Sequence, residues 1–310
     1  MSITQYFMRR LVQLIPVLII ISIVVFVVMR LSGDVAALLL PEDYTQDELE
    51  AMRRALGLDR PLYVQYGYFI RDAVQGDFGR SFRYNMPALP LVLERLPITI
   101  KVTFSGILVA VLIAVPAGVM AALRQNSAAD LTTTSLAVVG RAMPNFWVGI
   151  MLILVFAVML RWLPVSGYQG PKYLILPAIS LGTGAAAVAT RLMRSSMLEV
   201  LRLEYIMTAR AKGLSQRVVV YKHALRNALI PVVTVVGLQT AALLGGAIIT
   251  EQIFSLPGLG RLMVQALNGR DMAVVQAGVV VFAVVVMSIN LLIDLLYTLI
   301  DPRIRYASGK

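Results

Sequence analysis

The stretch VTFSGILVAVLIAVPAGVMAAL, residues 102–123, decides the fold class, because it runs from end to end without a charged side chain. A bilayer-spanning helix needs roughly 20 mostly apolar residues to cross about 30 Å of hydrocarbon. The whole chain of 310 residues is 58% hydrophobic and 15% charged, with a mean hydropathy of +0.79. Soluble domains usually carry about 25% charged residues. The composition therefore excludes most soluble enzymes and disordered proteins, and it predicts an all-α integral membrane protein.

Five further stretches pass the same test, so the sequence predicts six transmembrane helices. They are residues 11–29, 136–160, 173–190, 229–250 and 273–300. The first follows Arg9 and Arg10, as the apolar run of a signal peptide would, but it exceeds the about 7–15 residues of such a run, and no small-residue cleavage site follows. We therefore expect it to be retained as a helix.

Positive charge sets the expected orientation. Residues 191–228 hold eight Lys or Arg against two Glu, and the segments before the first helix and after the last are also basic. Basic loops stay on the cytoplasmic side, and six helices place these three segments on one side. The net charge of +11 is then mostly a topology signal rather than a nucleic-acid-binding surface. We expect both termini in the cytoplasm.

The predicted organisation has four parts. They are an N-terminal tip with the first helix (1–30), an external segment (31–96), a transmembrane domain of five helices with a cytoplasmic loop at 191–228 (97–300), and a cytoplasmic tail (301–310). In the external segment Thr45 and Glu48 form a capping-box pattern and Gly57 is a stop signal, which predicts a short helix. A second helix is expected over 62–73, followed by a turn at 76–79. The segment is either a cap over the helices or a docking surface for a soluble partner.

The cytoplasmic loop predicts two helices joined at a glycine. Residues 198–212 favour helix, Gly213 ends it, and residues 216–229 form a second helix that leads into the fifth span. The small side chains of Ala209 and Ala211 let another surface approach closely, and the flanking Arg and Lys could pair with acidic groups on it. The alternative is a solvated basic hairpin that only follows the positive-inside rule.

A few polar side chains inside the spans could line a path for a substrate. Polar and ionisable groups are costly in hydrocarbon, so each is a functional candidate. The candidates are Arg141, Asn145, Gln239, Asn290 and Asp294. Each could instead hold helices together or reach toward a helix end, which is the commoner role of such residues. The sequence leaves both interpretations open.

The sequence offers little for catalysis or metal binding. It has no cysteine, one histidine (His223), no GxxxxGK[ST] phosphate loop, and no Ser–His–Asp set or HExxH motif. We expect no catalytic residue, no metal site and no ATP hydrolysis on this chain, and an intramembrane enzyme is disfavoured. An ion-coupled secondary transporter would place carboxylates near the membrane midplane, where only Asp294 is available, and it lies toward one end. An ion-coupled carrier is therefore the alternative function from a different class of transport protein.

With these features in view, the sequence resembles the permease subunits of binding-protein-dependent ABC importers, in the dipeptide, oligopeptide and nickel branch that includes glutathione importers. The stretch EYIMTARAKGL at 204–214, followed by HALRNALIP at 223–231, is similar to the cytoplasmic motif of that family. Met207 stands where the family motif has its glutamate, six residues before the glycine, and the later proline is displaced to Pro231. Other segments agree in family order: RRL at 9–11, GLDRPL at 57–62, GDFGRS at 76–81, EQIFSLPGLG at 251–260 and DPRIR at 301–305.

The resemblance implies a type I ABC importer permease fold, and the long external segment resembles the first-permease type. It implies a path for di- and oligopeptides formed with a homologous second permease and supplied by a solute-binding protein; glutathione and nickel complexes are the alternative substrates. Two ABC ATPase subunits would bind ATP and Mg, while this chain would bind no cofactor and no nucleic acid. The chain would lie in the lipid bilayer of the bacterial inner membrane.

The implied contact with the ATPase lies around Gly213, where the glycine sets the bend and the neighbouring alanines allow a close fit. The residues expected to couple ATP hydrolysis to transport are Glu204, Thr208, Ala209, Arg210, Ala211, Lys212, Gly213, Leu214, His223, Leu225, Arg226 and Asn227.

Overall fold

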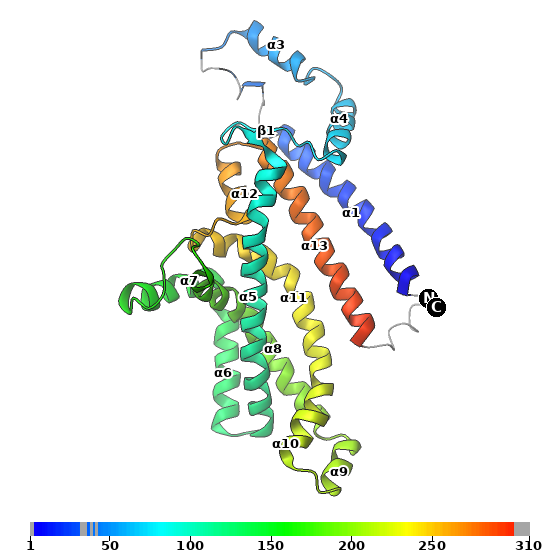
Figure 1. Ribbon diagram of the computed structural model, residues 1–310, viewed down its shortest axis with the longest axis vertical. Coiled ribbons are helices and arrows are strands. Elements are labelled where there is room, and N and C mark those ends of the chain that lie inside the picture. Colours follow the sequence, from blue (N-terminus) through cyan, green and yellow to red (C-terminus); the bar gives the residue numbers. More distant parts are fainter. Residues whose placement is uncertain (1–2, 32–35, 38–39, 41–42, 301–310) are drawn as a thin grey trace. The chain divides into compact units, whose positions relative to one another are not determined.

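The computed structural model describes residues 3–31, 36–37, 40 and 43–300, and its described residues are mostly helical (Figure 1). The predicted all-α class is confirmed, and the predicted tail at 301–310 lies outside the described residues. The longer elements are α1 (Ile3–Leu31), α5 (Ala88–Leu123), α6 (Ala128–Ala142), α7 (Asn145–Leu152), α8 (Ile175–Val200), α11 (Leu225–Ile253) and α13 (Met272–Ile300). The shorter ones are α3 (Gln46–Ala55), α4 (Leu62–Val74), α9 (Glu204–Ala211), α10 (Gln216–Val218), α12 (Leu259–Asn268), the π-helical η1 (Ile153–Met159) and η3 (Val219–Ala224), the 3₁₀ turn η2 (Pro171–Leu174), and the strands β1 (Arg80–Ser81) and β2 (Met86–Pro87).

Four described helical stretches are long and apolar enough to cross a bilayer. They are α5, η2 with α8, α10 through α11, and α13, and they contain four of the predicted spans. The first predicted span lies in α1, whose apolar part, Val12–Val28, is shorter. With one further bent pair of helices, the described residues hold up to five crossings by length and composition.

That bent pair corrects the third predicted span, because residues 136–160 do not form one straight helix. Helix α6 begins earlier, at Ala128, and ends at Ala142, and α7 with η1 then departs at 104°. Pro144 occupies the N-cap position of α7. A proline disfavours helical conformation in the residue before it, and Met143 is extended, with φ −75° and ψ 128°. The apolar run predicted a lipid-embedded segment but not its change of direction.

Three other boundaries differ from the predictions. Helix α8 continues to Val200, so the basic residues at 191–200 are helical, and the helix predicted over 198–212 is interrupted at residues 201–203. Helix α5 begins at Ala88, well before the apolar stretch that starts at residue 102. It directly follows an antiparallel hairpin of β1 and β2 that was not predicted. Helix α12 lies between the fifth and sixth predicted spans, where no helix was predicted. Helices α5 and α8 thus extend beyond the apolar runs that hydropathy detects.

The two helices predicted within residues 45–74 are confirmed. The Thr45 hydroxyl accepts a hydrogen bond from the Glu48 backbone N–H at 3.3 Å, and the Glu48 carboxylate accepts one from the Thr45 backbone N–H at 2.7 Å, which completes the capping box of α3. The backbone N–H of Thr45, and then its hydroxyl, lower the pKa of Glu48. Gly57 follows with φ +66° and ends this helical region. Helix α4 fills the predicted range 62–73 and extends one residue further.

The chain divides into two compact units, which are described separately. The first comprises residues up to 96 together with 262–287, and the second comprises residues 97–261 and those from 288 onward. In the first unit, the Ser81 hydroxyl bonds to the Asp271 carboxylate, and both residues are buried, which fixes the hairpin to the start of α13. The Ser22 and Tyr66 hydroxyls bond at 2.8 Å, which joins α1 to α4.

In the second unit α8 is the central helix, packed by α6, α7 and α11 (Figure 1). Its inner face is rich in small residues, as is typical where helices approach closely in lipid. A β-carbon added at Gly182 would lie 2.5 Å from the carbonyl oxygen of Gly106 in α5. The contact between the α5 and α8 backbones therefore requires glycine at position 182.

Candidate functional site

The region that sequence analysis singled out forms a compact elbow, defined here as residues 204–227. It comprises α9, a turn at Gly213, α10, η3 and the first residues of α11. Helix α9 ends in a Schellman motif: the Leu214 N–H donates to the Ala209 carbonyl at 3.4 Å and the Gly213 N–H donates to the Arg210 carbonyl at 2.9 Å. Gly213 has φ +75°, a left-handed conformation that glycine adopts without steric cost. The predicted role of Gly213 as the end of the helix is confirmed.

One face of α9 is buried inside the protein. Ile206 and Ala209 lie in an apolar cluster with Val219, Val220 and Ala224 of η3. The same cluster contains buried residues of α5, α8 and α11. The elbow is therefore packed into the core of the second unit and is not a loosely attached hairpin.

A polar contact also joins α9 to η3 and to the start of α11. The Asn227 Nδ2 donates to the Tyr205 hydroxyl at 2.6 Å, and this hydroxyl donates to the His223 carbonyl at 3.4 Å. Asn227 and His223 were predicted site residues, whereas Tyr205 was not. Its partner is 22 residues away in the sequence, so only the folded elbow reveals the contact.

The other face of α9 is exposed. Nine of the twelve predicted coupling residues lie exposed: Glu204, Thr208, Arg210, Ala211, Lys212, Gly213, Leu214, Arg226 and Asn227. His223 and Leu225 are half-buried, and Ala209 is buried against η3. The small side chain at position 209 thus serves the packing of the elbow itself, while Ala211 leaves space at the surface. The exposed face can accept a second protein surface with acidic groups.

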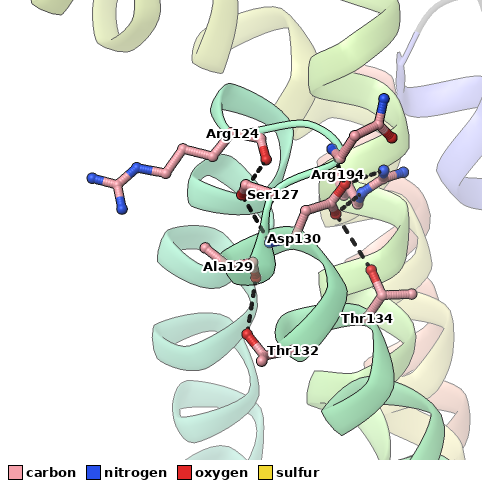
Figure 2. Close-up of polar contacts among 8 residues, drawn as sticks. Arg124, Ser127, Ala129, Asp130, Thr132, Thr134 and Arg194 are labelled. Carbon is pink, nitrogen blue, oxygen red and sulfur yellow. Dashed lines mark hydrogen bonds and ion pairs between the residues drawn. The ribbon is translucent and has the colours of Figure 1, made fainter.

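An ion pair that sequence analysis did not identify joins α6 to α8. Arg194 of α8 donates from Nε and Nη2 to the two carboxylate oxygens of Asp130, at 2.5 and 2.7 Å (Figure 2). The Asn126 backbone N–H and the Thr134 hydroxyl also donate to this carboxylate. Two-point pairing of this kind fixes geometry as well as charge. Sequence analysis counted Arg194 only as one of several loop charges, and the helix-capping position of Ser127 was the one local signal for Asp130.

The ion pair lies next to the apolar cluster of the elbow. Arg194 belongs to the same segment of α8 as Met193 and Met197, which are buried in that cluster. Helix α6 is thereby tied to the same part of α8 that packs on the elbow. Movement of this part of α8 is expected to be transmitted to α6.

The predicted path residues are not brought together in one cluster by any contact among the described residues. Arg141 and Asn290 are exposed on α6 and α13, and the side chain of Asp294 lies outside the described part. The Asn145 side chain lies within 4 Å of the positions that β-carbons would take at Gly184 and Gly246, and the Asn145 backbone carbonyl accepts a hydrogen bond from the Ser180 hydroxyl. Asn145 therefore lies in the packing between α7, α8 and α11.

Gln239 differs from the other path candidates. Its Nε2 is buried and has no hydrogen-bond partner among the described residues. Within the same described set, no group of three or more His, Asp or Glu could hold a metal ion.

Comparisons with known proteins identify the chain. Residues 114–306 match the binding-protein-dependent transport system inner membrane component family, and residues 3–103 match the N-terminal part of such transport system membrane components. The chain belongs to this family. It is an ABC importer permease of the dipeptide and glutathione branch, and in this family separate ATPase subunits hydrolyse ATP. The predicted family and the assignment as a non-enzymatic permease are confirmed.

Similar proteins support this assignment across the whole length of the permease. A dipeptide transport system permease protein of Alkalihalophilus pseudofirmus is 45% identical over 97% of this chain and 99% of its own length. A glutathione transport system permease protein of Escherichia coli strain K12 is 44% identical with the same coverage. An inward-facing structure of the MetNI methionine ABC transporter aligns with a TM-score of 0.59 and 21% identity, over 68% of this permease and 96% of that chain. The fold is that of a type I importer permease.

Proposed function

We propose that the permease forms, with a homologous second permease, the path by which di- and oligopeptides cross the bacterial inner membrane. A soluble binding protein delivers the peptide at the external face, and two ABC ATPase subunits drive transport. The observation that carries this proposal is the elbow. It presents an exposed face with Arg210, Ala211 and Lys212, while its opposite face is buried in the core of an importer permease.

The elbow suits the transmission of movement from an ATPase. An acidic groove on the ATPase can pair with Arg210 and Lys212, and Ala211 permits close approach. Because Ile206 shares its apolar cluster with residues of α5, α8 and α11, a displacement of α9 would carry these helices with it. The ion pair between Asp130 and Arg194 would extend the same displacement to α6.

The proposal includes an orientation and a division of chemistry. The basic elbow and both termini lie in the cytoplasm, and residues 31–96 lie outside, in agreement with the positive-inside rule. ATP and Mg bind to the ATPase subunits, and the permease binds no cofactor of its own.

Peptide is the proposed substrate because a relative with 45% identity is named a dipeptide permease. Glutathione is the second candidate, since a relative with 44% identity is named a glutathione permease. Of the predicted path residues, Gln239 has the geometry that fits best. Its buried Nε2, which has no partner in the described part of the chain, costs free energy until an acceptor reaches it, and a peptide carbonyl is such an acceptor.

Uptake into proteoliposomes tests the proposal. The vesicles contain both permeases and both ATPases, with ATP and Mg inside and the binding protein with labelled dipeptide outside. We expect uptake that requires both ATP and the binding protein, and competition by unlabelled glutathione measures the second candidate. Equal uptake without ATPase subunits, driven by a proton or sodium gradient, would contradict the proposal and indicate an ion-coupled carrier.

A further inference from the structure

The first unit contains a cavity of about 500 Å³. Its walls come from α1, α3, α4, α13 and the connection between α3 and α4, all through residues of this unit. Cavities of about 300–1,000 Å³ are the usual size for binding sites. The cavity is therefore large enough to hold several side chains of a partner.

The cavity wall is strongly positive. Among the described residues that line it, Arg30, Arg54, Arg60 and Arg71 stand against one acidic residue, Asp72. Arg71 bonds to this carboxylate at 2.8 Å. Arg71 and Asp72 neutralise each other, so Arg54 and Arg60 give this part of the described wall a positive charge, which favours an occupant with carboxylates.

A buried acceptor in the same wall requires a donor. Gln65 is 8% exposed, and its Nε2 donates to the carbonyls of Leu58 and Arg60 at 3.1 and 2.6 Å. Its Oε1 is buried and has no hydrogen-bond partner among the described residues. Buried polar atoms in native proteins are nearly always paired. An occupant that supplies an N–H group in addition to carboxylates would complete this site.

The surroundings of the cavity favour a protein as the occupant. Tyr68 lies between Arg60 and Arg71, whose guanidinium carbons are 5.2 and 5.1 Å from its ring centre. Arginine and tyrosine dominate the binding energy of protein interfaces.

We infer that this cavity is a docking socket for an acidic surface loop of the soluble binding protein. Carboxylates of the loop pair with Arg54 and Arg60, and a backbone N–H of the loop donates to the Oε1 of Gln65. The inference rests on the proposed function, since it requires a binding protein on the side of the membrane that residues 31–96 face.

The test uses charge reversal at Arg54. This side chain is exposed and donates to a carbonyl of its own helix at the long distance of 3.4 Å, so its replacement leaves α3 intact. Arg53 is the matched control, because it lies in the same last turn of α3 but does not line the cavity. Binding of the purified binding protein to the complete transporter in nanodiscs is measured by biolayer interferometry for Arg54→Glu and Arg53→Glu at several salt concentrations.

We expect Arg54→Glu to raise the Kd at least about tenfold at low salt, because a close interfacial charge pair becomes a repulsive one. Arg53→Glu should change the Kd less than about twofold, and the difference between the two variants should shrink as salt screens exposed charges. One Asp→Lys or Glu→Lys variant in a panel of binding-protein variants should restore binding to Arg54→Glu.

Two results would overturn the socket. One is an equal Kd for the two variants, and the other is binding of free dipeptide to the wild-type transporter that Arg54→Glu abolishes, which would make the cavity a substrate site. This test measures the Kd of the binding protein and not transport, so its failure can be distinguished from failure of the uptake assay that tests the proposed function.

Discussion

Removal of the Ile206 side chain beyond its β-carbon should loosen the elbow without unfolding the permease. Ile206 is fully buried in the apolar cluster that joins α9 to η3. Ile206→Ala deletes three carbons, each worth about 0.8 kcal/mol of burial, and the cavity left behind brings typical costs to about 2–5 kcal/mol. Even the lower limit should increase local opening of α9 about thirtyfold, since about 1.4 kcal/mol corresponds to tenfold.

Two measurements on the reconstituted complex test this effect: hydrogen exchange of the α9 backbone, and the ratio of peptide transported to ATP hydrolysed. Backbone amides of residues 204–212 should exchange about thirtyfold faster in Ile206→Ala, and the peptide transported per ATP hydrolysed should fall. Met207→Ala is the control, because Met207 neighbours Ile206 but is 54% exposed. The reasoning is refuted if both variants exchange alike, or if exchange accelerates in Ile206→Ala while the ratio of peptide to ATP stays at the wild-type value.

Three further substitutions follow from the geometry. Gly213→Asp should leave insertion intact but uncouple ATP hydrolysis from uptake, because it strains φ +75° and adds bulk and charge at the exposed bend; normal transport would contradict this. Gly182→Val should reduce the yield of folded permease in detergent by forcing apart the backbones of α5 and α8, whereas Gly245→Ala, whose β-carbon meets nothing within 4 Å, should not. Asp130→Arg should impair uptake, and the added Arg194→Asp should restore part of it; a double variant as inactive as the single one argues against the ion pair.

Features that depend on neighbouring residues could be predicted from the sequence. The capping box of Thr45 and Glu48 and the helix stop at Gly213 are local patterns, and the structure contains both. Helix α12 could also have been predicted, because Leu259, Leu262 and Ala266 recur at helical spacing; all three are buried in the structure. The helical periodicity of apolar residues in the segment between the fifth and sixth predicted spans indicates this helix.

Features that depend on the fold could not be predicted. The residues of the Asp130–Arg194 pair are 64 positions apart, and Tyr205 reaches Asn227 only when η3 folds back on α9. Burial of Ala209 depends on the same folding, so the sequence assigned both alanines to the outer surface. Hydropathy identified the third apolar segment but contains no information on the direction that the chain takes after Pro144.

The contact between the exposed face of α9 and an ATPase is the central claim, and crosslinking tests it most directly. The chain has no cysteine, so Ala211→Cys provides one site for a maleimide–benzophenone probe, with Ala209→Cys as the buried control. The account predicts a permease–ATPase crosslink from position 211, with a yield that changes when ATP is added, and little labelling at position 209. Complete labelling at position 211 with no ATPase crosslink, in a complex that still transports dipeptide, would contradict it.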